Sequence, residues 1–166
     1  MKLLKELCEA HGAPGFEDAI RTIYRREMES LCDRMETDGI GNVIAIKDGK
    51  GPSPKKVMLA GHMDEIGFVV KHIDDNGFLK LSPLGGFDPK TLIAKRVMIQ
   101  SSHGGDMIGM VGVKPIHIMS PEDRKKMPTV PELFVDVGLD GDSAKKKIEI
   151  GDPVTLKQEF IQDGDR

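Results

Sequence analysis

The segment Val57–Phe68 constrains this chain most, because an apolar run is followed at once by a histidine and two acids. The run predicts a buried strand over residues 56–60, and Gly61 ends it. Open α/β sheets place their chemistry at the carboxyl end of such a strand. Residues two apart in an extended chain point to the same side, so we expect His62 and Asp64 to share one side.

His62 and Asp64 have the chemistry of a metal ligand and of the acid that orients it. An imidazole becomes a well-oriented ligand when a carboxylate or a carbonyl holds its second ring nitrogen. A His-x-Asp sequence supplies both groups within three residues. Residues 61–64 also fit a polar turn in which His62 is only hydrogen-bonded. The spacing by itself leaves both interpretations open.

Five short motifs are spread along the chain: residues 13–17 (Ala-Pro-Gly-Phe-Glu), 38–42 (Asp-Gly-Ile-Gly-Asn), 61–67 (Gly-His-Met-Asp-Glu-Ile-Gly), 114–117 (Lys-Pro-Ile-His) and 133–138 (Leu-Phe-Val-Asp-Val-Gly). Together they resemble the tetrahedral (TET-type) aminopeptidases, di-metal exopeptidases of which some are named glutamyl aminopeptidase, endoglucanase or cellulase M. The third motif resembles the first metal-ligand motif of that family. The resemblance extends over nearly all of this chain, but over only the first half or so of a family member.

The resemblance implies a full-length enzyme that removes amino-terminal residues from short peptides. It implies two divalent metal ions, zinc or cobalt, in the two-metal mechanism of aminopeptidases. His62 then corresponds to a metal ligand, and Asp64 to the catalytic acid that orients it. The family's bridging aspartate, paired glutamates, later aspartate and last histidine have no counterpart here. Most catalytic zinc sites use at least three protein ligands. We therefore expect this chain alone to be inactive, with weak metal affinity or none.

The pattern of the chain changes near Gly67, where we place a domain boundary. Residues 1–66 carry two helical patterns, at about 2–11 and 17–31, followed by a hairpin, as expected for the amino-terminal part of an α/β catalytic domain. Residues 67–166 contain short strands between turn signals and predict a β-barrel or a barrel-like sandwich. The resemblance implies that this second part is an inserted PDZ-like domain that serves assembly and walls the substrate cavity. The expected strands are 34–37, 42–47, 68–73, 77–82, 96–100, 107–113, 133–137 and 153–158, with short helical turns at 121–126 and 143–147.

Composition excludes some classes of partner. The formal net charge of −3, with acidic and basic residues mixed, argues against nucleic acid as a partner. No apolar segment reaches the length that spans a membrane, and residues 2–11 read as a charged amphipathic helix rather than a signal peptide. Cys8 and Cys32 have neither zinc-site nor disulfide-framework spacing, so we expect a cytoplasmic protein.

Two further histidines have identifiable roles. His11 follows the first helix and is expected to be a capping or solvent-exposed residue. His117 matches a position at which the resembled family generally keeps histidine. A structural hydrogen bond is its simplest role, and a contact with substrate or with a neighbouring subunit is the sharper one. The resemblance also implies a homo-oligomer built from dimers, with a dodecamer among the expected assemblies.

Two other functions remain as alternatives. An endoglucanase needs two facing carboxylates and usually aromatic side chains that stack on sugars. Asp64 and Glu65 are adjacent, and the chain has no tryptophan and one tyrosine, which disfavours that function. The other alternative is a non-catalytic assembly or binding module built on the barrel.

Overall fold

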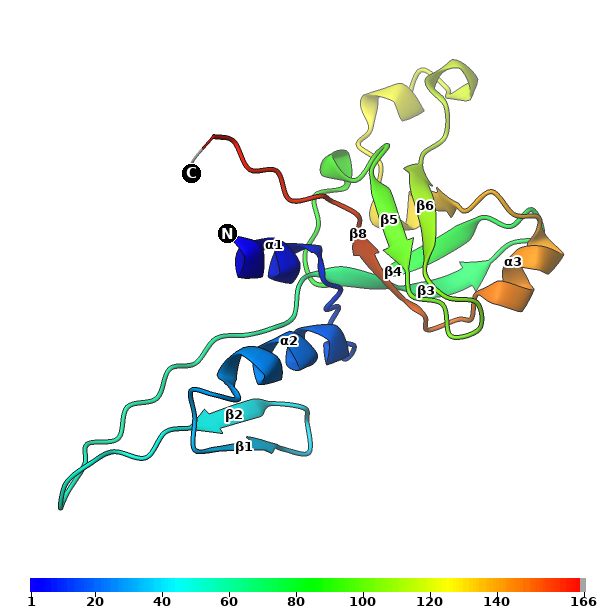
Figure 1. The fold of residues 1–166 in the computed structure, drawn as a ribbon. Coiled ribbons are helices and arrows are strands. Elements are labelled where there is room, and N and C mark those ends of the chain that lie inside the picture. The colour runs from blue at the N-terminus through cyan, green and yellow to red at the C-terminus, as the bar shows by residue number, and fades with distance from the viewer. Residues whose placement is uncertain (165–166) are drawn as a thin grey trace.

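The structure of this chain is a computed structural model that describes residues 1–164. Its two parts are visible in Figure 1: two helices with a small two-stranded sheet, and a β-barrel joined to them. No helix in the described part of the chain has both the length and the apolar character needed to cross a bilayer.

The amino-terminal part consists of two helices and one hairpin. Helix α1 spans Lys2–Glu9 and helix α2 spans Asp18–Met28, slightly shorter than the sequence predicts. Strands β1 (Arg34–Thr37) and β2 (Val43–Ile46) pair antiparallel, as predicted. Helix α2 contacts β2, whereas α1 contains no buried residue and leaves its leucines partly exposed.

The turn between β1 and β2 is held by one aspartate. The Asp38 carboxylate accepts hydrogen bonds from the backbone N–H of Ile40 at 3.1 Å and of Asn42 at 2.9 Å. The Asn42 side chain adds a third, from Nδ2 at 2.7 Å. Gly41 adopts φ of +92°, a conformation that favours glycine. This local chemistry explains why the hairpin can be predicted from its sequence.

The second part is a closed barrel of six strands, ordered β3-β4-β7-β6-β5-β8. A closed barrel leaves no unpaired strand edge. A short helix, α3, covers one end of it (Figure 1) and begins after Asp140, whose side chain accepts a hydrogen bond from the Ser143 amide at 2.9 Å. The strands are β3 (Gly67–Ile73), β4 (Leu79–Leu84), β5 (Arg96–Ile99), β6 (Met107–Gly112), β7 (Phe134–Asp136) and β8 (Pro153–Leu156), and α3 spans Gly141–Lys147.

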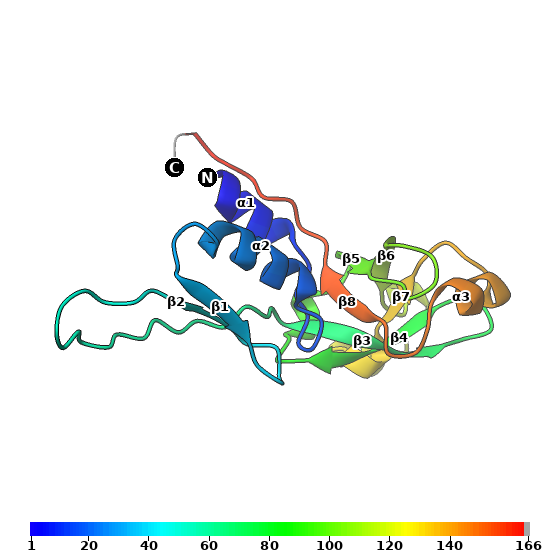
Figure 2. The same ribbon diagram turned by 60° about the horizontal axis from the view of Figure 1, so that its bottom comes forward.

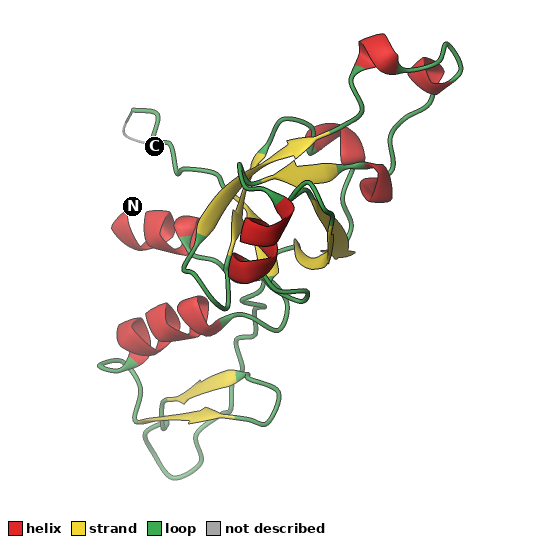
Figure 3. Ribbon diagram, turned by 90° about the vertical axis from the view of Figure 1, so that its right-hand side faces the viewer, coloured by secondary structure: helices red, strands yellow, loops and turns green. Residues whose placement is uncertain are grey.

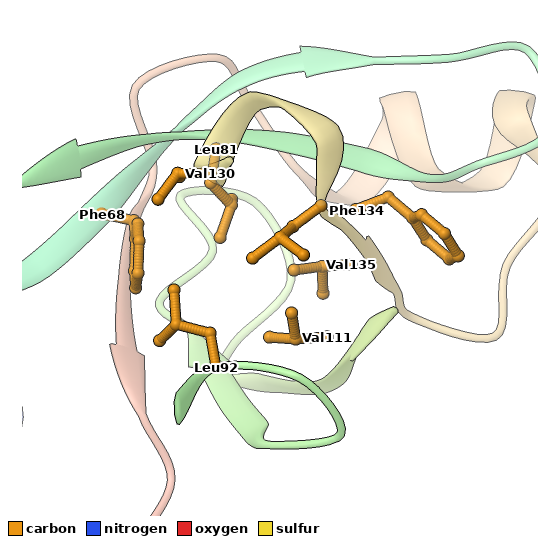
Figure 4. A pocket seen from close by; sticks show the side chains of 8 residues that line it. Phe68, Leu81, Leu92, Val111, Val130, Phe134 and Val135 are labelled. Atoms are coloured by element: carbon orange, nitrogen blue, oxygen red, sulfur yellow. The ribbon is translucent and has the colours of Figure 1, made fainter. Parts of the chain in front are cut away.

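The predicted barrel is confirmed, and it contains the main hydrophobic core. Phe68, Leu79, Val97 and Val135 are among the side chains that pack inside it. Figure 4 shows a small apolar gap between such side chains. Its volume of about 10 Å³ is no more than one water molecule needs, so we regard it as a packing gap. The gap is lined by Phe68, Leu81, Leu92, Val111, Val130, Leu133, Phe134 and Val135.

The prediction of a buried strand over residues 56–60 is wrong. The segment forms no strand, and Val57, Met58 and Leu59 are 83%, 87% and 94% exposed. Residues 47–66 form a long excursion that extends away from the helices and the barrel (Figures 1 and 2). A strand exists only when a neighbouring strand satisfies its backbone groups. No described strand pairs with residues 56–60, and the apolar side chains of Val57, Met58 and Leu59 stay exposed.

Candidate functional site

His62 and Asp64 lie in contact, in the extended segment that leads into β3. The Nδ1 atom of His62 is 2.9 Å from the carbonyl oxygen of Asp64 and 3.1 Å from its carboxylate oxygen Oδ1. A carbonyl oxygen can only accept, so Nδ1 carries the hydrogen and donates it. In the neutral ring the lone pair then belongs to Nε2, and the His62 side chain is 84% exposed. This is the arrangement in which an imidazole is ready to bind a metal.

Glu65 is separate from this pair. Its backbone N–H donates to the carbonyl of Gly12 at 2.8 Å, which ties the segment to the loop after α1. Desolvation raises the pKa of the Glu65 carboxyl, and a hydrogen bond with the Gly12 backbone opposes that shift. Glu65 therefore anchors the segment, whereas the Asp64 carboxylate faces His62.

The sequence predicts a capping or solvent-exposed role for His11, and the structure gives it a different position. It is half-buried, and its Nδ1 lies 2.6 Å from the hydroxyl oxygen of Thr155 on β8. Burial lowers the pKa of the His11 imidazole. Nothing in the spacing of the sequence connects residues 144 positions apart, so the contact can be found only from the fold.

His117 lies far along the chain from the His62–Asp64 pair and has no hydrogen bond to it. It sits exposed in the short 3₁₀ turn Ile116–Ile118, within an excursion between β6 and β7. Figure 3 shows this excursion projecting from the barrel, away from the helical part. Arg124 holds the turn by donating from Nε to the Ile116 carbonyl at 3.1 Å.

The described residues do not make a complete metal site. No group of three or more histidine, cysteine, aspartate or glutamate residues among residues 1–164 is arranged to hold a metal ion. The segment offers one imidazole nitrogen and the acid that orients it. A catalytic zinc site commonly needs three protein ligands. These residues fit one ligand position of a metal centre and leave the others unfilled.

Several relatives of this chain are named as aminopeptidases. A lysyl aminopeptidase of Pyrococcus furiosus is 37% identical over 139 residues, which cover 82% of this chain and 39% of the relative. A glutamyl aminopeptidase of Lactococcus lactis is 27% identical over 161 residues, which cover 95% of this chain and 45% of the relative. This chain thus spans less than half the length of these relatives.

Solved structures match the whole described fold. A TET aminopeptidase from a marine sediment archaeon (Thaumarchaeota) superposes with a TM-score of 0.90 at 34% identity, covering 98% of this chain and 46% of that one. An endoglucanase from Thermotoga maritima gives 0.81 at 34% identity, covering 97% and 46%. The TET1 peptidase of Pyrococcus horikoshii, which can assemble into a tetrahedron or a large octahedral shell, gives 0.82 at 28% identity, covering 96% and 47%.

A profile of the M42 glutamyl aminopeptidase family matches residues 41–166, which include the His62–Asp64 pair and every strand of the barrel. The match covers most of the chain and agrees with the relatives and the fold. This chain therefore belongs to the M42 glutamyl aminopeptidase family.

Proposed function

We propose that this chain is part of a longer di-metal aminopeptidase that removes amino-terminal residues from short peptides, with zinc or cobalt as the metal. Members of the M42 family are generally metal-dependent. The observation that carries the proposal is the contact of His62 Nδ1 with the carbonyl and carboxylate of Asp64, which leaves Nε2 free for a metal. Relatives more than twice as long leave room for the remaining ligands outside the residues of this chain.

In this proposal His62 supplies one metal ligand and Asp64 fixes its ring orientation. The other ligands and the general base come from outside this chain, so the chain alone is inactive and binds metal weakly or not at all. Calorimetric titration with zinc and with cobalt tests this point. We expect no tight binding to the chain alone. Tight stoichiometric binding that His62→Ala abolishes would show that the chain holds a complete site.

The barrel is proposed to be an inserted, PDZ-like domain beginning at residue 67, which builds a homo-oligomer and walls the substrate cavity. Two observations support a role in assembly: the barrel is closed and has its own core, and a similar TET1 peptidase forms large shells. His117 is the proposed contact with substrate or with a neighbouring subunit. A cytoplasmic location completes the proposal, in agreement with the free thiols of Cys8 and Cys32.

A non-catalytic assembly module is the second candidate, favoured by the same closed barrel. Size-exclusion chromatography with light scattering on residues 67–164 tests the assembly role that this candidate requires. A stable oligomer supports assembly through the barrel, and a well-behaved monomer argues against it. The endoglucanase alternative ranks lower, because the Asp64 carboxylate contacts His62 and not a second acid. Release of reducing sugar from cellulose by metal-free protein would reverse that ranking.

A further inference from the structure

Three segments distant in sequence meet at one junction beside the His62–Asp64 pair. The loop after α1 (residues 10–15) lies between the segment of residues 62–66 and strand β8. One hydrogen bond joins Gly12 to Glu65 at 2.8 Å, and another joins His11 to Thr155 at 2.6 Å. The loop therefore touches both the candidate metal-ligand segment and the barrel, and it is a physical link between them.

Close packing gives the junction little freedom. Ala13 is fully buried. A Cβ atom added at Gly67 would lie 3.0 Å from the Cβ of Ala13 and 3.0 Å from the Val154 carbonyl oxygen. A Cβ atom at Gly12 would lie 3.3 Å from the carbonyl oxygen of Met63. Backbones approach so closely here that a shift of the loop must be transmitted to the neighbouring segments.

The contact between His11 and Thr155 fixes this loop to the barrel. Thr155 is fully buried, and within residues 1–164 the only side chain that forms a hydrogen bond with its hydroxyl is that of His11. A buried hydroxyl that loses its partner is destabilising, so the contact is not readily given up.

We propose that His11 is a positioning residue that couples the barrel to the His62–Asp64 segment. Its hydrogen bond with Thr155 holds the loop on β8, and Gly12 in the same loop holds Glu65. The functional consequence, control of where His62 is presented, rests on the proposed role of His62 as a metal ligand. The mechanical coupling itself does not depend on that role.

The half-buried position of His11 makes the coupling sensitive to pH. Burial lowers the pKa of His11, Asp106 opposes that shift, and Lys157 adds to it. A group whose pKa is lowered in the folded state favours the docked junction above its ordinary pKa. That contribution is lost as the pH falls through the lowered value. The junction should therefore loosen in mild acid, below pH 6.5.

The test is hydrogen exchange and amide NMR on this chain, with three variants of the junction. His11→Ala and Thr155→Val remove the contact, and Thr155→Ser keeps the hydroxyl. We expect the Glu65 amide to exchange about 2- to 10-fold faster in the first two variants, the effect of losing one net hydrogen bond. In the same two variants the amide signals of residues 62–66 should shift. Thr155→Ser should resemble the wild type in both measurements. At lower pH the intrinsic exchange rate falls in every variant, so the comparison uses protection relative to that rate. Lowering the pH should reduce the protection of the Glu65 amide in the wild type and leave it nearly unchanged in His11→Ala.

His72→Ala is the matched control, because His72 is an exposed histidine near the other end of β3. It should leave the Glu65 amide unchanged. If Thr155→Val unfolds the barrel, the His11→Ala variant still tests the proposal, because it does not change the sequence of β8. Wild-type exchange at Glu65 in His11→Ala would overturn the proposal. The measurement needs neither metal nor peptidase activity. A failure of the proposed peptidase function is therefore distinguishable from a failure of the proposed coupling.

Discussion

Asp64 holds His62 through two acceptors, the backbone carbonyl and the carboxylate, of which only the carboxylate can be removed by mutation. We expect Asp64→Ala to lower the metal affinity of the proposed longer enzyme by about 10- to 100-fold, the usual effect of losing an orienting partner. Asp64→Asn should have a smaller effect because an amide oxygen still accepts. Competition with a chelator measures the affinity. Asp75→Asn, which alters an exposed ion pair with Lys145, is the control, and an equal loss there would contradict the assigned role.

Glu65 provides a second prediction, on the pH dependence of stability. Desolvation raises the pKa of its carboxyl, so the folded state favours the protonated form. The stabilising contribution is complete below the ordinary pKa of 4.5 and is lost as the pH rises through the higher value of the folded state. Glu65→Gln should remove this decline. The measurement is the free energy of unfolding in denaturant at several pH values, taken as the difference between variant and wild type. A difference that does not change with pH would contradict the prediction.

The His62–Asp64 pair is predictable from the sequence, and its surroundings are not. The two-residue spacing of His62 and Asp64 is local, and the structure places them in hydrogen-bond contact as expected. The role of His62 as a metal ligand stays a prediction. The sequence assigns His11 to a helix end because its partner, Thr155, is remote in sequence and becomes a neighbour only when the barrel closes.

At the scale of single elements, the turn between β3 and β4 depends on one glycine. Gly77 has φ of +90°, and an added Cβ atom would lie 2.0 Å from the Leu139 carbonyl oxygen. We expect Gly77→Ala to lower the free energy of unfolding by about 1–3 kcal/mol or more, from backbone strain together with the clash. Gly86→Ala is the control, since nothing lies within 4 Å of its added Cβ atom and its φ is not in the left-handed region. Thermal unfolding followed by circular dichroism compares the stability of the two variants. Equal stability of Gly77→Ala and Gly86→Ala would contradict the role assigned to Gly77.

The sequence predicts the barrel strands to within two residues at each end, whereas the strand predicted at residues 56–60 does not form. Strands β5, β6 and β8 begin where expected, because short apolar runs bounded by turn residues mark them locally. Each of them also finds its neighbours within the barrel. Residues 56–60 have the same local signal and no partner strand among the described residues. The apolar character of a segment predicts which side chains it would bury. It does not predict whether a partner strand is present to bury them.

At the scale of the whole molecule, the excursion before β3 contains three consecutive apolar side chains that are highly exposed. Val57, Met58 and Leu59 are 83–94% exposed and consecutive. In the proposed longer enzyme this segment would pack as a strand between others, which is the burial that its sequence predicts. In this chain alone, three such side chains in a row favour self-association.

We therefore expect the chain to form soluble aggregates that increase with concentration, and replacement of Val57, Met58 and Leu59 by serine to suppress them. The barrel lies outside the excursion, so its unfolding temperature should not change. The matched control replaces Ile116, Ile118 and Met127 by serine. These side chains are 68%, 59% and 54% exposed on the excursion between β6 and β7. Light scattering over a concentration series measures the association. If the control triple variant suppresses it equally, general surface hydrophobicity is responsible. If neither variant suppresses it, the unpaired segment is not what associates, and residues 56–60 do not behave as a strand that lacks its partner.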